Sequence, residues 1–166
     1  MNFPILSSLI LLPAVGALFL FFTRSNKENN ITVKYVALFT SLVNFFLSVY
    51  LWILFDQSTS EFQFVEDRVW IKDLINYKVG IDGISILFII LTTFITPLCI
   101  ISVNNSIKNR LSEFLIAILI MESFMIGVFC SLDLVVFYLF FEAGLIPMFL
   151  IIGIWGGSRR VYSAFK

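Results

Sequence analysis

Five long apolar runs divide the sequence, and they constrain the fold more than any other feature. We place them at residues 3–22, 33–55, 84–103, 114–130 and 134–155. Each is close to the ~20 residues that a helix needs to cross about 30 Å of hydrocarbon. Because backbone groups in lipid have to be hydrogen-bonded internally, we expect helices. The predicted fold class is all-α integral membrane, with five transmembrane helices in a single membrane domain over residues 1–166.

Composition excludes several classes of protein. Of the 166 residues, 60% are hydrophobic and only 13% are charged, which is too few to cover the surface of a soluble enzyme or to form a disordered tail. The formal net charge is zero, so no nucleic-acid partner is expected. The chain has no His, and its two Cys, Cys99 and Cys130, lie in apolar runs without CxxC spacing. We therefore expect no metal site and no disulfide.

Pro13, Pro97 and Pro147 lie well inside the apolar runs, away from their ends. In lipid they are expected to kink helices rather than to end them. The first run has no basic segment before it, so we interpret it as a retained helix and not as a secretory signal.

The distribution of Lys and Arg predicts the orientation in the membrane. Eight lie in the loops on one side and three in the long connector on the other: Arg24, Lys27, Lys34, Lys108, Arg110, Arg159, Arg160 and Lys166 against Arg68, Lys72 and Lys78. The side rich in positive charge faces the cytoplasm or the mitochondrial matrix. The N-terminus is then outside and the C-terminus inside.

The outer connector, residues 56–81, leaves two interpretations open. Alternation in Glu61-Phe62-Gln63-Phe64 and the later Val69-Trp70-Ile71 favour a small hairpin or an interfacial flap, with Trp70 and Tyr77 at headgroup depth. The alternative is an irregular segment that lies on the neighbouring helices.

Four acidic residues lie in or beside the runs. Asp82 and Asp133 stand where helices begin, and an N-cap explains both. Glu122 and Glu142 are each about nine residues from the nearer helix end, roughly 13 Å along the axis. A carboxylate at that depth costs at least ~2.5 kcal/mol, so we predict functional sites and assign both as candidate proton relays. The alternative for each is a protonated Glu with a structural hydrogen bond only.

Glu122 and Glu142 are expected at nearly the same depth, because each is ten residues from Leu132 in the turn between antiparallel helices. Depth does not tell whether they face each other. Tyr138 lies four residues before Glu142, so its hydroxyl is a candidate hydrogen-bond partner. Pro147 frees a carbonyl nearby, whereas Pro97 is interpreted as a kink only.

We expect no Lys or Arg inside the five spans, which leaves these acids without a cationic partner on this chain. A sixth helix is predicted to begin near residues 160–166. The chain is therefore expected to need another polypeptide to function.

The segment DLVVFYLFFE at 133–142, followed by LIPM at 145–148 and WG at 155–156, carries a resemblance. It resembles the signature of the antiporter-like proton-pumping subunits of respiratory complex I, most strongly their M-type branch, chain 4 of NADH-ubiquinone oxidoreductases. Three further segments are similar to the same family: LP at 12–13 with GA at 16–17, FD at 55–56 with FQFVE at 62–66, and GIDGIS at 80–85.

The resemblance implies a fold of about fourteen helices, of which this chain would be the N-terminal part. It matches Glu142 to the essential glutamate of the fifth helix, which pairs with a lysine on a later helix. That lysine would lie beyond Lys166. A split subunit completed by a second chain and a truncated remnant are both open. The resemblance assigns no role to Glu122.

The function implied is part of the proton-translocating membrane arm of complex I, a multi-pass subunit of NADH:ubiquinone reductase in the mitochondrial inner membrane or, alternatively, a bacterial plasma membrane. Its partners would be other membrane-arm subunits, a second chain with the remaining helices, and the lipid bilayer. NADH, FMN, iron-sulfur clusters and ubiquinone would belong to other subunits, so no cofactor is expected here. A cation/proton antiporter subunit and a catalytically silent scaffold are the alternatives.

Overall fold

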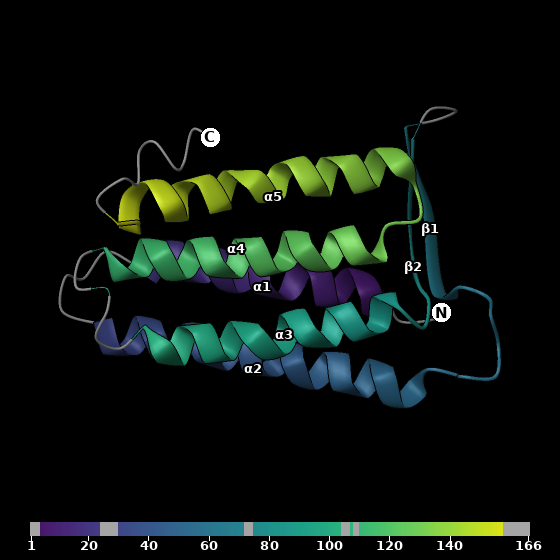
Figure 1. Cartoon of the computed structure of the whole chain (residues 1–166), viewed down its shortest axis with the longest axis horizontal. Helices are drawn as coiled ribbons and strands as arrows, with labels where there is room; N and C mark the ends of the chain where they lie inside the picture. The colour runs from purple at the N-terminus through teal and green to yellow at the C-terminus, as the bar shows by residue number, and fades with distance from the viewer. Residues whose placement is uncertain (1–3, 24–29, 72–74, 104–106, 108–109, 158–166) are drawn as a thin grey trace.

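A computed structural model of the chain describes residues 4–23, 30–71, 75–103, 107 and 110–157. Within these residues the chain forms five helices and one two-stranded sheet. The helices are α1 (Ile5–Thr23), α2 (Asn30–Leu54), α3 (Ser85–Ser102), α4 (Leu111–Cys130) and α5 (Leu134–Trp155). All five are long and apolar enough to cross a membrane, which confirms the predicted fold class. They lie side by side as one bundle, with the sheet across one end (Figure 1).

Helix α4 is the centre of the bundle. It packs against α1, α2, α3 and α5 and also contacts β2. Half of its membrane-spanning window is buried within the chain, against only 11% for α5. Two apolar clusters fill the interior, one near the sheet around Leu9, Ile89 and Ile126 and one near the opposite end around Leu20 and Leu119. The outer face of α5 is therefore mostly left to lipid or to other protein.

The helix ends differ from the predicted runs by up to three residues, because polar residues at the ends continue the helices. Helix α2 begins at Asn30 and α4 at Leu111, whereas the predicted runs begin at 33 and 114. The expectation that no Lys lies in a span is wrong, since the span in α2 includes Lys34. Its ammonium group donates to the carbonyl of Ile101 at the end of α3 (3.3 Å). A Lys this close to a helix end reaches the membrane surface along its flexible stem.

Pro13, Pro97 and Pro147 each lie inside a continuous helix and not at its end. The predicted sixth helix near 160–166 lies outside the residues described.

The outer connector contains a hairpin, which decides between the two interpretations of this segment. Strand β1 (Gln63–Ile71) pairs antiparallel with β2 (Ile75–Ile81). The hairpin crosses the ends of the helices and extends beyond α5 (Figure 1). Tyr77 is half-buried and its hydroxyl contacts Ser7 on α1, 3.2 Å away. The Trp70 side chain is not among those that the structure describes, so its position at headgroup depth stays a prediction.

Two contacts fix the hairpin to the bundle. The Leu132 N–H, in the turn between α4 and α5, donates to the Lys78 carbonyl of β2 (3.0 Å). The Glu66 carboxylate of β1 accepts from the Leu6 N–H (2.9 Å) and from the N–H and hydroxyl of Ser7. These amides are in the first turn of α1, where backbone N–H groups have no partner in their own helix. A negative charge there also stabilises the helix dipole.

Two glycines at the interface of α4 and α5 give a matched test of the helix packing. A Cβ at Gly127 would lie 2.7 Å from the Phe140 ring, whereas a Cβ at Gly144 would lie 3.8 Å from Phe124. Both Gly→Ala changes gain the same helix propensity, so a difference in stability between the two variants reports the clash with the Phe140 ring. We expect Gly127→Ala to be less stable than Gly144→Ala by about 1–3 kcal/mol, measured as thermal stability in detergent. Equal stability of the two variants would contradict the close packing of α5 on α4.

Candidate functional site

Glu122 lies in the interior of the bundle, on α4. Its side chain is 2% exposed, and Asn44 on α2 is fully buried beside it. The Asn44 side-chain amide donates to Glu122 Oε1 over 2.9 Å. The other two oxygens of the pair, Glu122 Oε2 and Asn44 Oδ1, are buried without a hydrogen-bond partner among the residues described. Glu122 is thus held by a neutral partner and not by a cation of the described helices.

Further polar side chains lie next to this pair. The Ser123 hydroxyl donates to the Ile10 carbonyl of α1 (2.6 Å), and Ser48 on α2 hydrogen-bonds Thr93 on α3 (2.7 Å). All three hydroxyl residues are almost fully buried. The middle of the bundle is therefore connected by hydrogen bonds from α1 through α4 and α2 to α3.

Glu142 has a different environment, on the exposed side of α5. Phe140 and Gly144 face α4, because the Phe140 ring lies beside Gly127 and a Cβ at Gly144 would meet Phe124. Glu142 is two residues from each of them, which is about 200° around a helix. It therefore points away from α4. Tyr138 lies on the preceding turn, four residues before Glu142, and stays the predicted hydrogen-bond partner of its carboxyl.

The two glutamates do not face each other, which answers the question that depth left open. Glu122 points from α4 toward α2, and Glu142 points away from the bundle. The rings of Phe124 and Phe140, with centroids 6.4 Å apart, lie between the two helices. A proton does not pass directly from one carboxyl to the other in this arrangement.

The two aspartates at helix starts have structural roles. Asp133 is the N-cap of α5 and accepts from the N–H groups of Val135 and Val136, which confirms its prediction. Asp82 accepts from the Ser85 N–H (2.7 Å), while its own N–H donates to the Ser85 hydroxyl (2.9 Å). Although α3 is counted from Ser85, the Asp82 carbonyl accepts from the Ile86 N–H (3.2 Å), so Asp82 braces the first turn of the helix as the predicted N-cap does.

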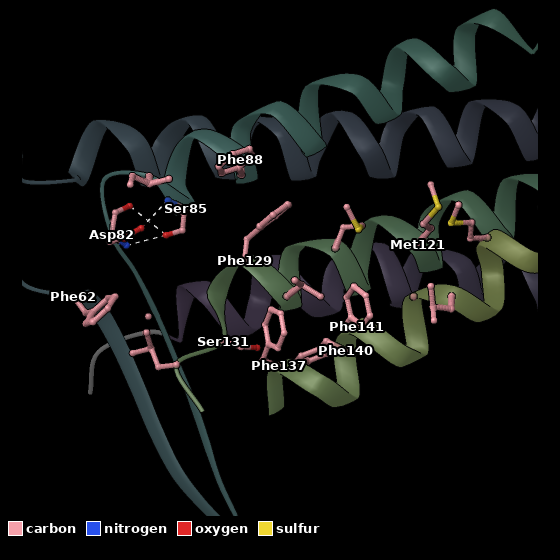
Figure 2. Close-up of a pocket in the computed structure, with 18 residues that line it drawn as sticks. Phe62, Asp82, Ser85, Phe88, Met121, Phe129, Ser131, Phe137, Phe140 and Phe141 are labelled. Atoms are coloured by element: carbon pink, nitrogen blue, oxygen red, sulfur yellow. Dashed lines mark hydrogen bonds between the residues drawn. The ribbon is translucent and has the colours of Figure 1, made fainter. Parts of the chain in front are cut away.

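An apolar groove of about 880 Å³ lies between α3 and α5, with α4 as its floor (Figure 2). Asp82 and Ser85 lie at its end near the hairpin, and the aromatic side chains Phe88, Phe129 and Phe141 line its walls. Within the described part of the chain, no group of three or more His, Cys, Asp or Glu is placed to hold a metal ion.

Sequence reasoning missed two residues of this arrangement. Asn44 is an amide in the middle of an apolar run, which in lipid predicts a polar partner on another helix, but its spacing does not identify Glu122. The contact of Glu66 with α1 spans about sixty residues of sequence, and no local pattern indicates it.

Comparison with known proteins shows what this chain is similar to. Residues 131–166 match the family described as NADH:quinone oxidoreductase/Mrp antiporter, TM. NADH-quinone oxidoreductase subunit M of Rhodobacter capsulatus is 59% identical over 80% of this chain and 26% of its own length. The subunit M of Rickettsia conorii is 45% identical over the whole chain and 34% of its own length. NADH-ubiquinone oxidoreductase chain 4 of Marchantia polymorpha is 48% identical over 96% of this chain and 32% of its own length.

Five apolar helices with carboxyl groups inside two of them define a multi-pass membrane protein with protonatable side chains at membrane depth. The chain spans about a third or less of the length of these relatives. Over residues 131–166 it is similar to the NADH:quinone oxidoreductase/Mrp antiporter family, and over most of its length it is similar to a part of the subunit M and chain 4 relatives.

The bracing role of Asp82 predicts a pH dependence of stability. Hydrogen bonds from Ser85, first from its N–H, lower the pKa of Asp82 below the ordinary value of 3.8. A carboxyl with a lowered pKa in the folded state stabilises the fold above its unfolded pKa and loses that contribution as the pH falls through its folded pKa. We expect Asp82→Asn to be less stable than the wild type at pH 7, and the difference to shrink below about pH 3.8. Thermal melts across pH 2–7 measure this, and a difference independent of pH would contradict it.

Proposed function

We propose that this chain is part of the proton-translocating membrane arm of an NADH:quinone oxidoreductase, and that Glu142 is a proton-relay residue in it. The observation that carries the proposal is the position of Glu142, a carboxyl in the middle of α5 that points away from its own bundle. The relatives of this chain are named as subunit M and chain 4 of such oxidoreductases.

The cost of a charge in hydrocarbon supports a relay role for Glu142. An isolated carboxylate at this depth costs at least ~2.5 kcal/mol, so it needs a cation, a hydrated cavity or a proton. Among the described helices, α1, α3, α4 and α5 contain no Lys or Arg. Lys34 of α2 donates to the Ile101 carbonyl at the end of α3 and not to Glu142. A cationic partner on another polypeptide segment would therefore complete the site. Approach of this cation would favour the ionised form of Glu142, and its withdrawal would favour the protonated form.

Tyr138, one turn before Glu142 on the same face of α5, would offer its carboxyl a hydroxyl that can donate or accept a hydrogen bond. Only a small part of α5 is buried within this chain, so a neighbouring helix has access to the face that carries both residues. Pro147, one turn further, leaves the Ala143 carbonyl without its usual N–H donor and able to bind water. Together these groups would pass a proton along the outer face of α5.

The proposal includes the partners and location. The chain would associate with other membrane-arm subunits and with a second chain that carries the remaining helices, within a lipid bilayer. NADH, FMN, iron-sulfur clusters and ubiquinone would bind to other subunits of the complex. The location would be the mitochondrial inner membrane or a bacterial plasma membrane, with the N-terminus on the side with fewer positive charges.

Two other functions remain to be separated by experiment. The matching family description includes Mrp antiporters, which favours a cation/proton antiporter subunit as the first alternative. A scaffold without proton chemistry is the second, and it would tolerate a neutral residue of the same shape at Glu142.

Glu142→Gln tests the relay in the assembled membrane complex. The amide keeps the shape of the side chain but cannot release a proton, so we expect proton translocation to fall at least about tenfold, equivalent to about 1.4 kcal/mol in the rate-limiting barrier. Tyr138→Phe is expected to have a smaller effect, because water can replace a hydroxyl. Proton uptake by vesicles during NADH oxidation is the measurement.

Asp133→Asn is the matched control, since it removes one negative charge from the same helix and Asn is an equally good N-cap. It is expected to keep proton translocation. Normal translocation in Glu142→Gln would favour the scaffold, and sodium-dependent proton exchange without NADH oxidation would favour the antiporter.

A further inference from the structure

We propose that Glu122 and Asn44 form a second, separate proton-binding site, in which Glu122 is held as a neutral acid and exchanges its proton with water through the cavity between α3 and α4. The site goes beyond the proposed role of Glu142, because it faces the interior of the bundle and uses a different side of the chain.

The unsatisfied atoms of the pair indicate the proton. An N–H of Asn44 already donates to Glu122 Oε1, which leaves Glu122 Oε2 and Asn44 Oδ1 as two buried acceptors without a donor in the described structure. Leaving buried acceptors unpaired costs their full desolvation free energy. A proton on Oε2 turns that atom into a donor for Asn44 Oδ1, either directly or through one water molecule. A single proton therefore satisfies both atoms.

The lack of a nearby cation on the described elements around Glu122 also favours its neutral, protonated form. Glu122 is 2% exposed, and ionised carboxyls are not kept in such places without compensation. Of the elements packed against α4, α1 and α3 carry no Asp, Glu, Lys or Arg. On α5 the acidic residue is Glu142, which points away from α4, and on α2 the charged residue is Lys34, held at Ile101. Arg68 and Lys78 belong to the hairpin at the end of the bundle.

A cavity of about 620 Å³ gives Glu122 a route to water. Its lining includes Glu122, Thr92 and Thr96 in the middle of the bundle and continues to Ser102 and Ile107, where α3 connects to α4. From Thr92 to Ser102 this is about 15 Å along α3. The hydroxyls of Thr92 and Thr96 donate to carbonyls of their own helix, so their oxygens remain able to accept hydrogen bonds from water. The cavity ends on the side opposite the hairpin.

Labelling with dicyclohexylcarbodiimide in the intact membrane complex tests the site. This apolar reagent takes the proton of a neutral carboxyl onto its own nitrogen and bonds the carboxyl oxygen to its carbon, so it modifies protonated acids in apolar surroundings. We expect peptide mass spectrometry to find Glu122 modified at neutral pH, with a yield that falls as the pH rises. Glu113 is the control, since its carboxyl forms an ion pair with Arg110 (2.5 Å) at the end of the same helix and is expected to stay unmodified. No modification of Glu122 at any pH would overturn the proposal.

Substitution gives a second, independent measurement. In Glu122→Gln the new amide donates to Asn44 Oδ1 and its carbonyl accepts from Asn44, as the neutral acid would, so the amount of assembled complex is expected to match the wild type. Glu122→Met has a similar volume but leaves Asn44 without a partner, and is expected to lower that amount several-fold. Loss of assembly in Glu122→Gln would mean that Glu122 is an ionised partner of a cation and would overturn the proposal, whatever the result for Glu142.

The two native cysteines test the route to water. Cys99 is exposed and lines the same cavity, whereas Cys130 is buried. A thiol reacts with a charged methanethiosulfonate only where water reaches it and allows it to ionise. We expect Cys99 to react with a reagent added on the side of the α3–α4 connection, with Cys130 unmodified. Cys99 unreactive from that side would overturn the proposed route.

Discussion

Hydrocarbon supplies no hydrogen bonds, and the arrangement of this bundle depends on that constraint. Several polar side chains inside the helices are satisfied within their own turn, as Thr92 is by Phe88. Three others reach a neighbouring helix: Asn44 to Glu122, Ser48 to Thr93 and Ser123 to Ile10. Apolar packing alone allows helices in lipid to slide and rotate against one another. These three contacts fix the rotation and height of α1, α2 and α3 around α4.

Where the helices meet water, the same requirement is met by charge. The first N–H groups of α1 bind the Glu66 carboxylate, which brings the hairpin over the end of the bundle. The Lys78 carbonyl of β2 then accepts from Leu132 in the α4–α5 turn. The hairpin therefore links the first helix to the last two, and a displacement of α1 would be transmitted to the start of α5.

The parts of the structure that depend on length and polarity could be predicted from the sequence, because a helix in lipid has one length and one way to satisfy its backbone. The five helices and the cap at Asp133 follow from this. The rotation of each helix about its axis could not be predicted in the same way. Apolar residues surround each helix on all sides, so no amphipathic pattern indicates which face is buried. The sequence therefore left open whether Glu122 and Glu142 meet, and it did not identify Asn44 or Glu66 as partners.

The separation of the two glutamates limits how the two proposed proton sites could work together. A proton moves along a continuous series of hydrogen-bonding groups, and between α4 and α5 the structure has the rings of Phe124 and Phe140 instead. In the proposed roles, each carboxyl would therefore exchange protons with its own surroundings, Glu142 on the outer face of α5 and Glu122 through the α3–α4 cavity. A charge on one carboxyl would act on the other only through its electric field across these rings. Communication between the two sites would thus be electrostatic, while the protons themselves remain on opposite sides of the α4–α5 interface.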